Sequence, residues 1–496
     1  MSKSRLLVLA FVVALGLSVT PQAITVSDVF YTIGPIIPPI DLVAPYDHGF
    51  AVIVFNGSHT DVYLVNSSAV KLLYSWSPYN VTPCVPRTEY FLLGYSGLPS
   101  LYVMNGSLYA VLAYSPLGTP VVVFHGSKPE GAFLLQNATF GVLENLSALE
   151  VIRVVLAGGI PSFPIFPVLS TTVILNGTNV TVPGSVVTGL RLPQGDLIVS
   201  HTETYPFPFN YSVDHIYLYL VSGGKVKWQE NVTIVPVGEP RVVFVSGELF
   251  IVGKPSSSGQ AEVLEVNVTD GSLVREIDLG NVSWASVFNL GGKPYVAAII
   301  DNETVVYQVI NGNLSRVTAV PVGASVYPLF YYNPYHYVLF FTPTHGGTNV
   351  TAVRSTGVTS YFLKGQVVEA SDGDLLLNGS GHTTLVVLDE HGNAAREVAL
   401  GGIDLTYLPY LFRDGNASYL VSLEKNSTQV VVNVVEVRSN VTSYTQVLPV
   451  PPAMPGFTTA CYQLTPNEKA LIIALGALIT IAAVILLRKP RTSRRN

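Results

Sequence analysis

VLEVNVTDGSLVREIDLGN, residues 263–281, is the stretch of this chain that predicts its fold most directly. β-Branched and other apolar residues dominate both halves of the stretch, as they do in β-strands. The Asp270-Gly271 pair between the halves favours a tight turn with positive φ, which matches the right-handed twist of paired strands. We therefore expect a β-hairpin over residues 263–281.

The same unit, a strand, a polar turn and a second strand, recurs along the chain. Further copies occupy residues 61–78, 217–232, 306–323, 351–365, 385–402 and 432–450. The turn glycines Gly224, Gly271, Gly312, Gly357 and Gly392 are separated by 47, 41, 45 and 35 residues. A period near 40 to 50 residues with about four short strands is typical of β-propeller blades. One such sheet cannot bury both of its faces alone, so blades stack around an axis and cover one another.

The predicted fold class is all-β, a propeller of seven or eight four-stranded blades within residues 24–447. Residues 118–193 fit the period less well, and we expect an irregular blade there with an inserted loop around residues 163–167. The alternative is a tandem array of β-sandwich domains, which also have short strands at regular spacing. Sandwich domains would be separated by Pro-rich linkers about every 100 residues, and the first clear linker is residues 448–457.

Two of the turns carry a likeness to known repeat proteins. Asp270-Gly271 is followed by Arg275, and the turn from Asp389 to Gly392 is followed by Arg396. A strand that ends in an Asp- and Gly-containing turn, followed by a strand with a basic residue, resembles the repeat of quinoprotein-like and WD-like β-propellers. The likeness covers residues 196–450 better than the preceding chain. The resemblance implies a fold and no activity.

The N-terminus has the layout of a secretory signal. Lys3 and Arg5 precede an apolar run over residues 6–17, and small residues with plausible cleavage points follow between Ser18 and Ala23. The apolar run is too short for a comfortable membrane span, so we predict a signal peptide over residues 1–23. An uncleaved N-terminal anchor is the alternative.

The C-terminus predicts a membrane anchor. Residues 470–487 contain no charge, and 18 helical residues extend about 27 Å, close to the thickness of a hydrocarbon core. The tail 488–496 is basic, which marks the cytoplasmic side. A GPI signal is the rival interpretation, but it normally lacks such a basic run. We expect a Pro-containing stalk over residues 448–469, a single transmembrane helix in contact with membrane lipid, an ectodomain outside the cell and a cytoplasmic C-terminus.

Asparagines in the pattern Asn-x-Ser/Thr are far more frequent than chance. The chain has 26 Asn, and Ser plus Thr make up about 15% of its residues, so random placement predicts about four such sites. It contains nineteen, none with Pro in the middle position, and we predict N-glycosylation, which requires solvent-facing side chains. The acceptors are Asn56, Asn66, Asn80, Asn105, Asn137, Asn145, Asn176, Asn179, Asn210, Asn231, Asn267, Asn281, Asn302, Asn313, Asn349, Asn378, Asn416, Asn426 and Asn440.

Charge and cysteine content limit the partners. Residues 24–468 carry 18 Lys and Arg against 32 Asp and Glu, a net charge of −14, which argues against nucleic acid as a partner. The two cysteines, Cys84 and Cys461, could form a disulfide in an extracellular protein or remain separate thiols. Two cysteines alone cannot make a zinc ribbon.

The search for catalytic, cofactor or metal motifs assigns no residue to any of these roles. HExxH, HxH, GxSxG, Walker A and GxGxxG patterns are all missing from the sequence. Asp372, Asp374 and Asn378 loosely suggest a calcium loop, but the closing Glu is missing and leucines fill the centre, so a turn and a strand are expected. A hydrolase stays possible, because the carboxylates of such a site need only be spatial neighbours.

Aromatic residues are dense in residues 205–220 and 327–341. Exposed Tyr can stack on sugar rings, but packing between blades is the expectation here.

The favoured function is a non-catalytic cell-surface glycoprotein: an envelope component, an adhesin or a binding module with a protein or glycan partner. The alternative is a membrane-tethered extracellular hydrolase that acts on carbohydrate or peptide in a propeller channel. The low charge and abundant acceptor asparagines are similar to those of archaeal surface proteins.

Overall fold

The structure is a computed structural model, and it describes residues 43–55, 60–76, 99–112, 119–135, 138–155, 168–175, 178–204, 211–322, 328–379, 382–401, 409–425 and 428–450. All of these belong to one compact unit, Pro39–Trp76 and Ser96–Pro452. The expected signal peptide, membrane helix and basic tail lie outside the described residues, as do Cys84, Cys461 and residues 451–469 of the expected stalk. Within the described ranges, no helix is both long enough and apolar enough to cross a membrane.

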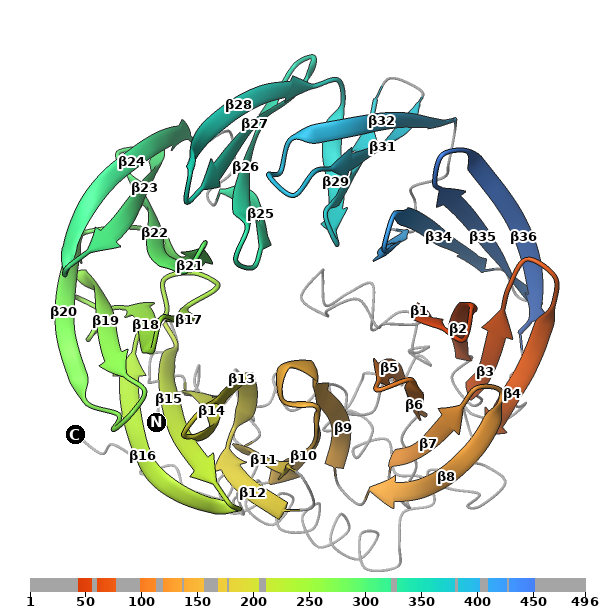
Figure 1. The fold of residues 1–496 in the computed structure, drawn as a ribbon, viewed down its shortest axis with the longest axis horizontal. Helices are drawn as coiled ribbons and strands as arrows, with labels where there is room; N and C mark the ends of the chain where they lie inside the picture. Colours follow the sequence, from red (N-terminus) through yellow and green to blue (C-terminus); the bar gives the residue numbers. More distant parts are fainter. Residues whose placement is uncertain are drawn as a thin grey trace, which may run out of the picture. The chain divides into compact units, whose positions relative to one another are not determined.

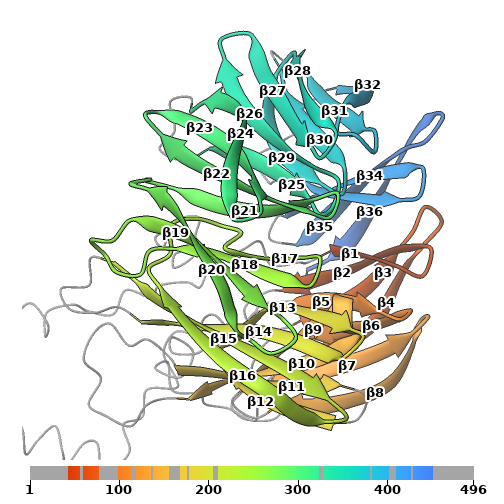
Figure 2. The same ribbon diagram turned by 60° about the vertical axis from the view of Figure 1, so that its left-hand side comes forward.

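The described chain forms nine four-stranded antiparallel sheets, which follow one another around an axis (Figure 1 and Figure 2). Hydrogen-bonded neighbours within each sheet are consecutive strands of the sequence, with the first strand nearest the axis and the fourth at the rim. The fold is therefore a nine-bladed β-propeller. The all-β class and the four-stranded blades are confirmed, and the predicted number of seven or eight blades is too low.

The first four blades contain sixteen strands and one short 3₁₀ helix. Blade 1 consists of β1 (Val43–Tyr46), β2 (Gly49–Phe55), β3 (Thr60–Val65) and β4 (Val70–Trp76). Blade 2 consists of β5 (Ser100–Met104), β6 (Ser107–Val111), β7 (Thr119–His125) and β8 (Lys128–Leu135). Blade 3 consists of β9 (Ala138–Leu143), the helix η2 (Glu144–Leu146), β10 (Ala148–Val155), β11 (Val168–Leu175) and β12 (Thr178–Pro183). Blade 4 consists of β13 (Ser185–Leu192), β14 (Gly195–Thr204), β15 (Val213–Ser222) and β16 (Lys225–Ile234).

The remaining five blades repeat the same meander. Blade 5 consists of β17 (Val242–Val245), β18 (Glu248–Gly253), β19 (Ala261–Asn267) and β20 (Leu273–Gly280). Blade 6 consists of β21 (Ala285–Leu290), β22 (Lys293–Ile300), β23 (Glu303–Ile310) and β24 (Asn313–Pro321). Blade 7 consists of β25 (Leu329–Asn333), β26 (Tyr337–Thr344), β27 (Gly347–Arg354) and β28 (Gly357–Leu363). Blade 8 consists of β29 (Gln366–Ser371), β30 (Asp374–Asn378), β31 (Thr383–Leu388) and β32 (Ala394–Gly401). Blade 9 consists of β33 (Tyr410–Asp414), β34 (Ala417–Lys425), β35 (Gln429–Val437) and β36 (Val441–Pro449).

The repeated unit of the sequence is the hairpin of the third and fourth strands of a blade. Residues 263–281 form β19, a turn and β20, and Gly271 in that turn has a φ of 78°. A positive φ of this size is open to glycine without steric cost. The sequence pattern therefore detected the outer half of each of these blades.

The missing blades lie within residues 118–193, where that pattern is weak. This region holds the outer hairpin of blade 2, all of blade 3 and the first strand of blade 4. The outer strand β8 reads KPEGAFLL and is exposed over almost its whole length, so its Pro and Gly are tolerated at the rim. Such a strand has little apolar alternation from which it could be recognised.

Burial changes from the middle of each blade to its rim. All six residues of β3 and of β21 are buried, because blades cover both faces of these strands. The outer strand β36 is mostly exposed, with Leu448 as its fully buried residue. Nine clusters of buried apolar side chains lie among the described residues, one at each junction between neighbouring blades. The core is therefore divided among the blade junctions.

Among the described strands, none is exchanged between the two ends of the ring. Blade 1 contains only N-terminal strands and blade 9 only C-terminal strands. Their junction is an apolar cluster that includes Phe50 and Val52 from blade 1 and Val432 and Leu448 from blade 9. Side-chain packing, and not a shared sheet, holds the two ends together.

Candidate functional site

Thirteen of the nineteen acceptor asparagines lie in described parts of the chain, and none of the thirteen is buried. At least one belongs to every blade. Asn66 and Asn267 are partly exposed. The fully exposed ones are Asn105, Asn145, Asn179, Asn231, Asn281, Asn302, Asn313, Asn349, Asn378, Asn416 and Asn440. The six outside the described residues are Asn56, Asn80, Asn137, Asn176, Asn210 and Asn426.

The other described asparagines provide an internal comparison, because they share the side chain and lack the pattern. They are Asn289, Asn311, Asn333, Asn393 and Asn433. Of these five, only Asn311 is exposed, and Asn289 is buried. The high exposure of the acceptor group is therefore not a property of every asparagine in this fold.

The two groups also differ at the amide nitrogen that would carry a sugar. In Asn289, Asn393 and Asn433, Nδ2 donates to a backbone or carboxylate oxygen at 2.8, 3.0 and 3.0 Å. Among the described acceptors, only the Nδ2 of Asn313 donates to another described residue, over 3.4 Å. The nucleophilic atom is thus largely uncommitted within the acceptor group.

Asn66 and Asn267 engage their side-chain oxygen instead. The Oδ1 atom of Asn66 accepts from the backbone N of Ser68 at 3.0 Å, the Ser68 hydroxyl at 2.8 Å and Ala69 N at 2.9 Å. In Asn267 the same atom accepts from Thr269 N at 2.8 Å. These Asx turns fix the Asn side chain against its own Ser or Thr and leave Nδ2 unbonded within the described residues.

A cluster of acids lies at the inner end of the junction between blades 8 and 9. Asp374 begins β30 and is fully buried, and neither of its carboxylate oxygens forms a hydrogen bond within the described chain. Arg413 on β33 donates through Nη1 to the carbonyl of Leu388 at 3.1 Å. Asp372 occupies the turn before β30 with a φ of 49°. The junction combines a buried carboxyl group with a cation that is already bonded to backbone.

Burial shifts these carboxyl groups in one direction. Desolvation raises the pKa of Asp374 to about 6, although nearby Ser418 and Arg413 act to lower it. Burial also raises the pKa of Asp372 and of Glu369 on β29. Glu369 pairs across the sheet with Leu376, which packs against blade 9, so its side chain faces the same junction. The cluster therefore has a higher proton affinity than ordinary surface acids.

The accessibility of the cluster limits its chemistry. A general acid or base must come within hydrogen-bond reach of a substrate atom. Asp374 is excluded from that role because it is completely covered, whereas Asp372 is exposed and Glu369 partly exposed. The raised pKa of Asp374 follows from its burial among the leucines of this junction, where an ionised carboxylate is poorly solvated.

A second polar group joins blades 4 and 5. Asp214 is fully buried, its Oδ1 lies 2.8 Å from Nδ1 of His201, and its Oδ2 accepts from Arg241. In blades 3 and 7, Thr171 and Thr348 lie on the third strand, as Asp214 does in blade 4. Their hydroxyls donate to backbone carbonyls that precede the next blade, at 2.6 and 2.9 Å. Asp214 is thus a charged version of a recurring latch between blades.

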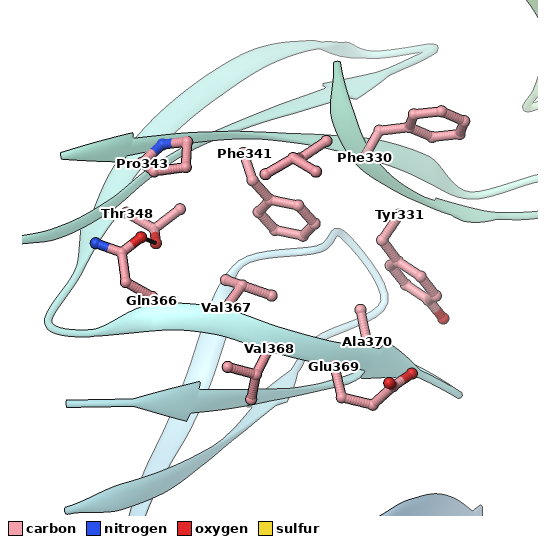
Figure 3. A pocket seen from close by; sticks show the side chains of 11 residues that line it. Phe330, Tyr331, Phe341, Pro343, Thr348, Gln366, Val367, Val368, Glu369 and Ala370 are labelled. Atoms are coloured by element: carbon pink, nitrogen blue, oxygen red, sulfur yellow. Dashed lines mark hydrogen bonds between the residues drawn. The ribbon is translucent and has the colours of Figure 1, made fainter. Parts of the chain in front are cut away.

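A cavity of about 290 Å³ lies between blades 7 and 8 (Figure 3). Val367 and Ala370 face Phe341 across it, whereas Glu369 points to the other side of β29. The amide of Gln366 donates to the carbonyls of Thr344 and Gly347 at 2.8 and 3.0 Å. The cavity is therefore mainly an apolar gap in a blade junction, and its amide group already has partners.

The aromatic runs pack mostly between blades, as predicted. Phe288 and Tyr332 meet edge to face, with 5.1 Å between ring centroids, at the junction of blades 6 and 7. Tyr337 is 1% exposed, while Tyr335 stays half exposed. Residues 205–210 and 323–327 lie outside the described chain.

The suggested calcium loop is a turn followed by a strand, as expected. Asp374 and Asn378 stand at opposite ends of β30, which separates them by four residues of extended chain. In the part of the chain that the structure describes, His, Cys, Asp and Glu form no group of three suited to a metal ion.

The buried acids are the polar residues that sequence reasoning missed. Four acids are at most 7% exposed: Asp61, Asp214 and Asp374 stand near the start of an apolar strand, and Glu265 lies in the middle of β19. An acid near the start of a strand buried on both faces is the signal that could have pointed to the first three.

Comparisons with known proteins add no family and no activity to the fold described above. No family model and no curated protein matches the sequence. Solved structures are similar, among them the β-propeller domain of the Trilobed protease from Pyrococcus furiosus, with 10% identity, a TM-score of 0.35 and coverage of 64% of this chain and 98% of that one. A eukaryotic initiation factor gives 9% identity, a TM-score of 0.41 and coverage of 80% and 99%. AztD from Citrobacter koseri gives 11% identity, a TM-score of 0.34 and coverage of 66% and 95%. The finer likeness to quinoprotein-like blades stays a prediction.

Proposed function

We propose that this protein is a non-catalytic cell-surface glycoprotein, whose nine-bladed propeller is displayed outside the cell and anchored by the segment 470–487. The observation that carries the proposal is the contrast between the two groups of asparagine. Eleven of thirteen described acceptors are exposed, against one of five other described asparagines. Because an attached sugar is bulky and must project into solvent, this contrast is what glycosylation requires.

The distribution of the acceptors supports a coat over the whole propeller. Asn66, Asn267 and Asn440 lie at turns between third and fourth strands, whereas Asn302 and Asn378 lie at turns between second and third strands. In a meandering blade these two sets of turns are at opposite ends of the strands. Sugars at all sites would thus project from both ends of the propeller and supply solubility to a chain with only 12% charged residues.

Peptide mapping of the native protein by mass spectrometry tests the proposal. We expect glycan masses on most of the nineteen acceptors and unmodified side chains at Asn289 and Asn433, which serve as internal controls. Protease added to intact cells should digest the propeller and spare the basic tail 488–496. Unmodified acceptors throughout the native protein, or a tail that is cleaved on intact cells, would overturn it.

A second candidate is a membrane-tethered hydrolase, and the raised pKa values of Asp372 and Glu369 favour it. Both carboxyl groups retain solvent exposure near the inner strands. Turnover of an oligosaccharide or peptide by the purified ectodomain, lost in both D372N and E369Q, would support this alternative over the first.

A further inference from the structure

Six of the described acceptor asparagines lie within strands, so the register fixes their neighbours. In an antiparallel pair, directly opposed side chains point to the same side, with Cβ atoms about 4.5–5.5 Å apart. Four of the six oppose an apolar side chain that retains exposure, always in the pair of third and fourth strands. The pairs are Asn179 with Ile174, Asn231 with Tyr217, Asn313 with Ile310 and Asn349 with Phe362.

Asn349 and Phe362 form the most favourable of these pairs. Asn349 is exposed on β27, and Phe362 on β28 is 50% exposed. A Cβ atom placed on Gly347 would lie 2.8 Å from the tip of the Phe362 ring, so the ring covers the position two residues before Asn349. The absence of a side chain at Gly347 leaves room for the ring on the face of β27 that carries Asn349.

The rest of the acceptor pattern shares this surface. Thr351, the third residue of the Asn349 pattern, opposes Ser360, and their hydroxyl oxygens are 3.3 Å apart. Asn349 and Thr351 on one strand and Ser360 and Phe362 on the other therefore form a square of side chains on one side of blade 7. The aromatic ring is the only large apolar group among these four residues.

We infer that the sugar linked to Asn349 packs its C–H face against the ring of Phe362, an inference that rests on the glycosylation proposed above. A pyranose joined to Nδ2 is tethered within a few ångströms of the opposed residue. The face of an aromatic ring carries partial negative charge and attracts the weakly positive C–H groups of a sugar face. Stacking would also remove from water an apolar side chain that the protein itself leaves half exposed.

The competing occupant of Phe362 is a partner protein, which would use the same exposed ring. The sugar and the partner protein differ in whether they depend on Asn349. A sugar stack requires a glycosylated Asn349 and is present in the isolated monomer. Binding of a partner protein does not require Asn349 and is absent from the isolated monomer.

The test is a double-mutant cycle with N349Q and F362A, made in a host that glycosylates the full-length protein. We expect N349Q to lower the thermal midpoint by about 1 °C when Phe362 is present and to have no effect in F362A. In labelled glycoprotein, sugar protons at Asn349 should show contacts to the aromatic ring and an upfield ring-current shift, both lost in F362L. F362L keeps the apolar volume and guards against a simple folding defect.

Asn378 is the matched control acceptor, because the residues opposite it are Gln366 and Thr383. N378Q combined with F362A should show no coupling. If Asn349 carries sugar and the cycle shows neither coupling nor ring contacts, the inference fails and the proposed function stands. The same conclusion follows if Asn349 alone is unmodified. Unmodified asparagines at all sites would overturn the inference and the proposed function together.

Discussion

The Gln446 side chain in the last blade donates through Nε2 to the backbone carbonyl of Asn66 in the first blade, over 3.1 Å. This hydrogen bond joins the fourth strand of blade 9 to the turn between the third and fourth strands of blade 1. It crosses the point where the N-terminal and C-terminal ends of the ring meet.

The same kind of contact is found at other junctions, where no closure is needed. Lys71 of blade 1 donates to Ser127 in the corresponding turn of blade 2 at 2.6 Å, and Tyr361 of blade 7 donates to the carbonyl of Gly392 in blade 8 at 2.8 Å. The closing junction is therefore built like an ordinary one. Within the described chain no strand is shared between the ends, and the apolar cluster between blades 9 and 1 is the main contact that joins them.

Leu448 tests this account of closure. The side chain is fully buried in the cluster between blades 9 and 1, so L448A leaves a cavity there. We expect a loss of about 2–5 kcal/mol in the free energy of unfolding, measured by urea denaturation. V447A is the matched control, because Val447 is 52% exposed on the same strand, and it should change stability by less than about 0.5 kcal/mol. Equal effects of the two variants would contradict a packed closure.

Much of the propeller could be predicted because its outer hairpins carry turn chemistry that is local in sequence. Asp270-Gly271 marks β19–β20 through a positive φ that glycine readily adopts. Blade 2 escaped the count because its outer strand β8 is exposed almost throughout and contains Pro and Gly. A blade count based on alternating apolar and polar residues fails for an outer strand such as β8, because a strand exposed at the rim does not need that alternation.

The polar junctions could not be predicted, for a different reason. Asp374 and Arg413 are 39 residues apart and belong to different blades, so only the closed ring brings them together. Acceptor asparagines are the opposite case, because three consecutive residues define each one. The acceptor asparagines could therefore be found from three neighbouring residues. The residues that meet at a blade junction are set by how the sheets stack, which the local sequence does not show.

Asp214 is predicted to act as a structural latch and not as a catalytic group. D214A would leave Arg241, which is 15% exposed, without its buried partner, and we expect a loss of about 3–5 kcal/mol in unfolding free energy. D196A is a suitable control, since Asp196 pairs with Arg191 at 3.1 Å and the Arg191 side chain is 53% exposed. That variant should cost less than about 1 kcal/mol. Comparable losses in both variants, measured by the same denaturation curves, would argue against a special role for Asp214.

The stability of the junction between blades 8 and 9 should depend on pH. Burial raises the pKa of Asp374 from 3.8 to about 6, so the folded protein binds its proton more tightly than the unfolded chain does. The resulting stabilisation is complete below about pH 4 and is lost as the pH rises through about 6. D374N keeps a neutral side chain at every pH and should exceed the wild type by up to about 3 kcal/mol at pH 7.5, but not at pH 4.

Denaturation curves between pH 4 and pH 8 measure this difference. Glu150 supplies an independent case on blade 3, because burial raises its pKa to about 7. The free energy of unfolding of E150Q should therefore also rise relative to that of the wild type as the pH increases, and this difference should keep growing up to and above about pH 7. A D374N advantage of the same size at all pH values would contradict a titrating Asp374.

Asn66 allows the effect of a sugar to be separated from that of the turn that carries it. S68A destroys the acceptor pattern but leaves the bonds from the backbone N of Ser68 and Ala69 to Oδ1 in place. N66D also removes the acceptor nitrogen and keeps that oxygen, whereas N66A removes both. Because the turn also positions the carbonyl that Gln446 binds, we expect N66A to be less stable than N66D by about 1 kcal/mol. Peptide mass mapping should show loss of the sugar in all three variants, so any stability difference among them belongs to the turn. Equal stability of N66A and N66D would mean that the Asx turn contributes nothing to closure of the ring.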